Sequence, residues 1–66
     1  MKLTWNDTDQ IAWILSDNNP EIDPLSISFP RLMEMILKIE NFSASAEECT
    51  EAALESIQMA WYEEVQ

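Results

Sequence analysis

Apolar residues in the middle of the chain recur with the period of an α-helix. Spacings of three and four residues separate Leu32, Met35, Ile36 and Ile39. These side chains therefore share one helical face. Pro30 suits the first helical position, where an amide hydrogen would have no helical acceptor. The pattern predicts a helix over residues 30–40, the strongest helical pattern in the chain, with a face that other elements must cover.

A second helix is predicted over residues 8–17. Asp7 is a natural N-cap, and Gln10 three residues later would complete a capping box. Its apolar face consists of Ile11, Ala12, Ile14 and Leu15. The helix ends before Pro20, because proline restricts the residue that precedes it.

A third helix is predicted over residues 46–64, beginning at a capping box of Ser45 and Glu48. Its apolar face consists of Ala53, Leu54, Ile57, Ala60 and Trp61. In the connector between the first two helices, Asp23 followed by Pro24 favours a turn, and residues 27–29 suffice only for a brief strand. Together the patterns predict one compact all-α domain over residues 1–66, with three helices and short irregular connectors.

Missing residue types exclude several classes of function. The 66 residues contain no histidine, no glycine and one cysteine. Structural zinc sites and iron–sulfur clusters need about four Cys or His ligands. Phosphate-binding loops need glycine, and Ser-His or Cys-His catalytic pairs need histidine. We therefore expect no enzyme activity and no organic cofactor.

The charge narrows the range of partners. Thirteen Asp and Glu residues against three Lys and Arg give a formal charge of -10. Such a surface repels nucleic acid and anionic membranes, whereas it attracts a basic protein patch or hard cations. The chain has no apolar run long enough to span a membrane, and a single unpaired cysteine fits a reducing compartment. We expect a cytoplasmic monomer that binds another protein.

Residues 17–23 have oxygen-bearing side chains at the spacing found in the first seven positions of a calcium-binding EF-hand loop. The rest of that loop is missing, because Ile22 replaces its glycine and Ser28 replaces its bidentate glutamate. The sequence therefore argues against an EF-hand. The many carboxylates still favour weak, unselective surface binding of hard divalent ions, Fe2+ included, although runs of acidic residues are usually solvated faces.

The three tryptophans have different expected positions. Trp61 continues the apolar face of its helix and is expected in the core, and Trp5 precedes the Asp7 cap and could pack across the helix start. Trp13 lies off the apolar face of its helix. Either that helix is buried on two sides, or Trp13 is exposed and anchors a protein partner. Cys49 has acidic neighbours that oppose a thiolate, so we expect a small buried or half-buried residue.

Five short motifs follow one another at residues 3–7, 20–24, 27–29, 40–42 and 61–64. The L-x-W-x-D start, the P-[DE]-x-D-P turn and the W-x-[DE]-E end are specific in combination. In this order and at this length they resemble the IscX family, also called YfhJ. These are small acidic accessory proteins of bacterial iron–sulfur cluster assembly, and the resemblance covers essentially the whole chain without gaps.

The resemblance implies a small helical fold akin to a winged helix. It also implies a non-enzymatic protein that binds the cysteine desulfurase, binds ferrous iron weakly and competes with bacterial frataxin. Two places depart from the family pattern. The loop after Phe42 lacks the usual run of Asp, which removes the basis for an iron-binding role of that loop. Trp13 stands where a polar residue is usual, which either alters the partner surface or reflects another packing.

These matches and the acidic clusters predict two overlapping sets of site residues. The expected iron ligands are Asp7, Asp17, Glu21, Asp23, Glu63 and Glu64. The expected partner-binding residues are Asp7, Asp9, Trp13, Glu40, Glu63 and Glu64. The leading hypothesis is an adaptor or regulator that docks on the desulfurase. The alternatives are an iron donor and a metal-independent acidic inhibitor that masks a basic surface.

Overall fold

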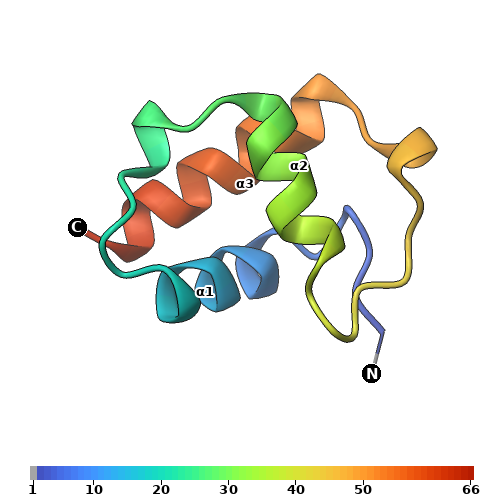
Figure 1. Ribbon diagram of the computed structural model, residues 1–66, viewed down its shortest axis with the longest axis horizontal. Helices are drawn as coiled ribbons and strands as arrows, with labels where there is room; N and C mark the ends of the chain where they lie inside the picture. Colours follow the sequence, from blue (N-terminus) through green and yellow to red (C-terminus); the bar gives the residue numbers. More distant parts are fainter. Residues whose placement is uncertain (1) are drawn as a thin grey trace.

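The computed structural model describes residues 2–66 and contains three α-helices (Figure 1). The elements in order are α1 (Thr8–Asn18), the 3-10 turn η1 (Pro24–Ser26), α2 (Phe29–Leu37), the 3-10 turn η2 (Ala46–Glu48) and α3 (Glu51–Glu64). Within residues 2–66 the β structure amounts to one isolated parallel bridge, between Leu3 and Phe42. The predicted all-α three-helix fold is confirmed, while the finer likeness to a winged helix stays a prediction.

The predicted apolar faces meet in a single core. Helices α1 and α3 pack along each other, and α2 lies across the pair (Figure 1). The buried core residues are Leu3, Trp5, Ile11, Ala12, Leu15, Leu32, Ile36, Leu54, Ile57 and Trp61. Burying a side chain of leucine size contributes about 1.5–3 kcal/mol. Because all three helices and the N-terminal segment supply such side chains, none of these elements is stable without the others.

The predicted start of the third helix is wrong, because a helix does not run unbroken from residue 46. The sequence offers two N-caps, and each is used. The carboxylate of Glu48 accepts a hydrogen bond from the Ser45 amide at 2.9 Å, so the predicted capping box closes around η2. Thr50 Oγ1 accepts the Ala53 amide at 3.1 Å and caps α3 itself. Side-chain capping of this kind is what fixes a helix start.

The predicted capping box at α1 does not form. Asp7 occupies the N-cap position, but its side chain makes no bond to the helix. Its carboxylate instead accepts the Thr4 amide at 2.8 Å. Asp7 therefore braces the turn that precedes the helix, and Gln10 is left to solvent.

The connector also differs from the sequence-based expectation in one respect. Residues 27–29 form no strand, because Phe29 already begins α2, and α2 ends at Leu37 instead of residue 40. The turn at Asp23 and Pro24 is confirmed as η1, where Asp23 Oδ1 accepts the Leu25 amide at 3.0 Å.

Residues 3–5 are held against residues 41–45, an arrangement that we call the N-terminal clasp. The Leu3 amide donates to the Asn41 carbonyl at 2.8 Å, and the Leu3 carbonyl accepts the Ser43 amide at 2.9 Å. Trp5 Nε1 donates to the Ser45 carbonyl at 2.8 Å. The Trp5 ring meets Phe42 edge-on, with centroids 4.8 Å apart. Trp5 thus joins two segments forty residues apart in sequence.

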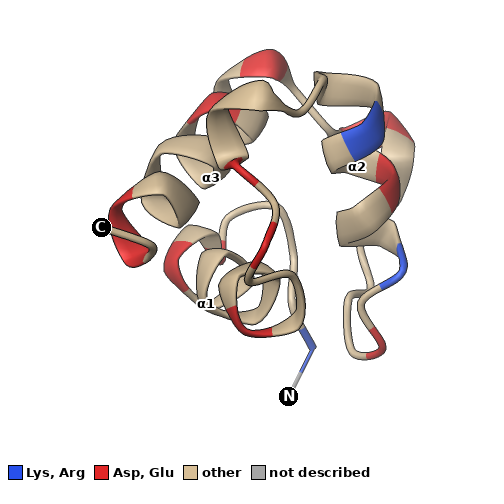
Figure 2. Ribbon diagram, turned by 60° about the vertical axis from the view of Figure 1, so that its left-hand side comes forward, with Lys and Arg blue, Asp and Glu red and all other residues tan. Residues whose placement is uncertain are grey.

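The acidic groups lie on the surface and are not neutralised by neighbours. None of the charged side chains is buried. Among residues 2–66, no carboxylate forms an ion pair. Helices α1 and α3 carry only acidic charges, whereas Arg31 and Lys38 lie on and just after α2, and Lys2 lies at the N-terminal end (Figure 2).

We expect Trp5→Phe to lower the free energy of unfolding by about 0.5–1.5 kcal/mol, because it removes the hydrogen bond to Ser45. The matched control is Trp13→Phe, at an indole that is 59% exposed, where surface changes stay within about 0.5 kcal/mol. Urea unfolding followed by far-UV circular dichroism measures both. Equal losses for the two variants would contradict the clasp.

We expect the melting temperature to rise with added NaCl, because the unpaired carboxylates repel one another and salt screens that repulsion. A gain of about 1 kcal/mol corresponds to about 4–8 °C in a domain of this size. Calorimetry from low to moderate salt measures it. The double variant Glu47→Gln, Glu55→Gln should respond less, and a flat or falling melting temperature for the parent protein would refute this explanation.

Candidate functional site

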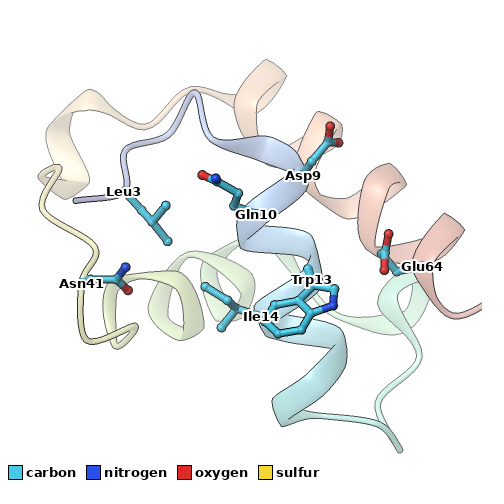
Figure 3. A pocket seen from close by; sticks show the side chains of 7 residues that line it. All are labelled: Leu3, Asp9, Gln10, Trp13, Ile14, Asn41 and Glu64. Carbon is cyan, nitrogen blue, oxygen red and sulfur yellow. The ribbon is translucent and has the colours of Figure 1, made fainter. Parts of the chain in front are cut away.

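One flank of α1 and the last turn of α3 border an open pocket of about 470 Å³ (Figure 3). We call it the Trp13 pocket. It is lined by Leu3, Asp9, Gln10, Trp13, Ile14, Asn41 and Glu64. Figure 3 shows the Trp13 indole between Ile14 and Glu64, with Leu3 and Asn41 at the opposite end of the pocket from Glu64.

Helical periodicity explains the α1 side of this pocket. Ile11 and Leu15 are buried against the core. The pairs at Asp9–Trp13 and Gln10–Ile14 are each four residues apart, so they lie one turn above the other on the flank next to the buried face. The α1 flank therefore presents two adjacent rows, one of Asp9 and Trp13 and the other of Gln10 and Ile14.

The remaining lining residues come from distant parts of the chain. Glu64 is the last residue of α3, and the packing of α3 along α1 brings it to Trp13. Leu3 and Asn41 lie next to each other at the pocket because a 2.8 Å backbone hydrogen bond of the N-terminal clasp joins them. The pocket thus depends on the packing of α3 along α1 and on the N-terminal clasp.

The two alternatives for Trp13 are resolved in favour of exposure. Its side chain is 59% exposed, whereas Trp5 and Trp61 are 6% and 0% exposed. Trp61 is therefore in the core as predicted, although its buried Nε1 has no acceptor among the described residues. Burying a large aromatic surface is favourable, so an exposed indole beside a pocket leaves that free energy available for binding.

The structure brings three of the predicted partner-binding residues to one pocket, namely Asp9, Trp13 and Glu64. The other three lie close by in the chain. Asp7 borders a neighbouring hollow that Asp9 also lines, Glu40 precedes the lining residue Asn41, and Glu63 precedes Glu64. Their role in binding a partner stays a prediction.

The predicted iron ligands are dispersed over the molecule. Asp17 lies near the end of α1, Glu21 and Asp23 in the connector before η1, and Glu63 and Glu64 at the end of α3. Within residues 2–66 no three His, Cys, Asp or Glu side chains form a group suited to hold a metal ion. Asp7 and Asp23 already accept backbone amides. An iron site built from these residues stays a prediction.

Cys49 is half-buried, as expected, beside the start of α3. Burial raises the pKa of its thiol above the usual value, because a desolvated thiolate is unfavourable. The thiol is therefore protonated at neutral pH. A protonated thiol is a poor nucleophile and a poor metal ligand, which leaves Cys49 with a packing role.

Four lining residues were not foreseen, namely Leu3, Gln10, Ile14 and Asn41. Leu3 and Asn41 belong to two of the recognised motifs, so their motif membership was a usable indication. Gln10 and Ile14 follow from helical geometry once Asp9 and Trp13 are taken as site residues.

None of the helices described in residues 2–66 is both long and apolar enough to cross a bilayer.

Comparison with known proteins supplies the family. Residues 3–66 match the model of a family described as iron-sulphur cluster assembly. The chain is also 38% identical over 64 residues to the uncharacterized protein PA3808 of Pseudomonas aeruginosa strain PAO1, and the match covers 97% of each chain. The chain belongs to the iron–sulphur cluster assembly family, the IscX family that its motifs resemble.

Proposed function

We propose that this protein is a non-enzymatic adaptor or regulator that docks its acidic surface on the cysteine desulfurase of cytoplasmic iron–sulfur cluster assembly. Bacterial frataxin would compete for the same basic surface of the desulfurase. Membership of the family supports a role in assembly. One observation carries the docking proposal. The acidic side chains of α1 and α3 form no ion pairs, and two of them lie beside an exposed tryptophan at the Trp13 pocket.

Docking of this kind depends on desolvation and on long-range charge. Because the carboxylates of α1 and α3 have no intramolecular cation to lose, a basic partner can pair with them without breaking existing ion pairs. Complementary potentials accelerate encounter and select the partner. The exposed indole then contributes apolar burial at the centre of the contact.

We expect the double variant Glu63→Lys, Glu64→Lys to weaken desulfurase binding by about tenfold or more, because it reverses the charge beside the Trp13 pocket. The matched control Glu34→Lys, Glu47→Lys has the same net charge but changes groups outside the pocket. Isothermal titration or surface plasmon resonance measures the affinity, and the parent association rate should fall steeply as salt rises.

Asp7 is not used in this test because its carboxylate supports the turn before α1. Equal weakening by the two double variants would show that only total charge matters and would defeat a defined docking face. Affinity of the parent protein that is independent of salt would defeat the electrostatic mechanism as a whole.

Weak binding of ferrous iron is a subordinate part of the proposal. No group of three protein ligands exists within residues 2–66, so water would complete the coordination of any bound ion. Sites that combine few carboxylates with water discriminate poorly among hard divalent cations. This arrangement favours a regulator whose docking does not require metal over a dedicated iron donor.

We expect Mg2+ at millimolar concentration to displace Fe2+ from the protein, because oxygen ligands of this type select weakly between the two ions. An anaerobic Fe2+ titration with and without Mg2+, followed by NMR line broadening, measures the competition. Desulfurase binding should be unchanged after removal of metal with a chelator. Retention of Fe2+ against Mg2+ would instead support the iron-donor alternative.

A further inference from the structure

We infer that the Trp13 pocket is a receptor for a single arginine side chain of the protein partner. The inference rests on the proposed function for its biological setting, but it makes a separate claim about one pocket. It follows from the chemistry of the pocket wall, from the position of its two carboxylates and from a lining that, within residues 2–66, includes no basic side chain.

The wall of the pocket is apolar where an alkyl stem would lie. Leu3, Ile14 and the face of Trp13 supply this wall. Arginine and lysine bury their methylene groups along such surfaces while the charged head stays at the rim. The indole ring adds an electrostatic attraction, since tryptophan is the best aromatic acceptor for a cation over its face.

The two carboxylates of the pocket come from different helices and lie on the side of the indole away from Ile14 and Leu3 (Figure 3). Asp9 lies one turn before Trp13 on α1, and Glu64 lies beside the ring at the end of α3 (Figure 3). Both are exposed, and neither forms an ion pair. A cation seated on the indole would therefore have two acidic groups at one end of the pocket.

This arrangement favours arginine over lysine. A guanidinium is planar, so it can stack on the indole while its edge donates hydrogen bonds to carboxylates. An ammonium is a strongly hydrated point charge that cannot stack. The pocket is an open hollow of about 470 Å³, within the usual size range of pockets for small ligands.

Among residues 2–66, none of the residues that line the pocket is basic. Arg31 and Lys38 belong to the region of α2 (Figure 2). Lys2 directly precedes the lining residue Leu3 in the chain but does not itself line the pocket. Asp9 and Glu64 are therefore free of competing basic side chains from the described lining, so a cation from a partner could pair with them.

The test is an NMR titration of the full chain, labelled with nitrogen-15, using the peptide Ac-Gly-Arg-Gly-NH2. Its controls are the same peptide with citrulline, which has the shape of arginine without the charge, and with lysine. The Trp13 indole resonance should shift with the arginine peptide, while those of buried Trp5 and Trp61 stay in place. Arginine should bind about fivefold more tightly than citrulline or lysine.

Matched variants establish that the response comes from the pocket. Trp13→Ala and Glu64→Gln should each reduce arginine binding, whereas Met59→Ala, which truncates an exposed apolar residue outside the pocket, should not. Equal binding of arginine and citrulline, equal binding of arginine and lysine, or an unmoved Trp13 indole would each overturn the inference.

Binding to the desulfurase separates this inference from the proposed function. If the pocket accepts a partner arginine, Trp13→Ala weakens that binding by about tenfold. If Trp13→Ala has no effect while Glu63→Lys, Glu64→Lys abolishes binding, the arginine receptor is refuted and acidic docking stands. If the arginine peptide binds at Trp13 but the desulfurase does not bind at all, the receptor stands and the proposed function fails.

Discussion

The packing of α1 along α3 is the interaction on which the other features of this protein depend. It buries Ile11 and Leu15 on one side and Ile57 and Trp61 on the other, and burial of that size supplies most of the stabilising free energy of a small domain. The same packing sets the end of α3 beside the exposed flank of α1. The core and the Trp13 pocket are therefore two sides of one helix pair, and a change that rotates α1 would alter both.

The N-terminal clasp completes this arrangement with only a few residues. A segment of three residues contributes two core side chains, two backbone hydrogen bonds and one indole hydrogen bond. Because the clasp also places Leu3 at the pocket, it links the stability of the fold to the shape of the site. The L-x-W-x-D motif thus has a structural explanation: Leu3 and Trp5 hold the clasp, and Asp7 braces the turn into α1.

The three helices and most of their buried faces were predictable because helical periodicity is local, although the α1 pattern left the position of Trp13 open. The break before α3 was missed because Ser45 and Thr50 are both adequate N-caps, and only packing decides how they share the segment. The clasp was not predictable from periodicity, since it joins residues forty positions apart. For the site, Asp9, Trp13 and Glu64 were named from the sequence, but their convergence on one pocket required the tertiary structure.

The separation of charge described above has a consequence for how the molecule moves near a partner. Six of the thirteen carboxylates and no basic group lie on α1 and α3, whereas the other seven carboxylates share the rest of the chain with all three basic residues, so negative charge is denser on these two helices. The protein therefore has a permanent electric dipole in addition to its net charge. In the field of a cationic surface such a dipole experiences a torque, so that the molecule is turned with α1 and α3 leading before any atoms touch.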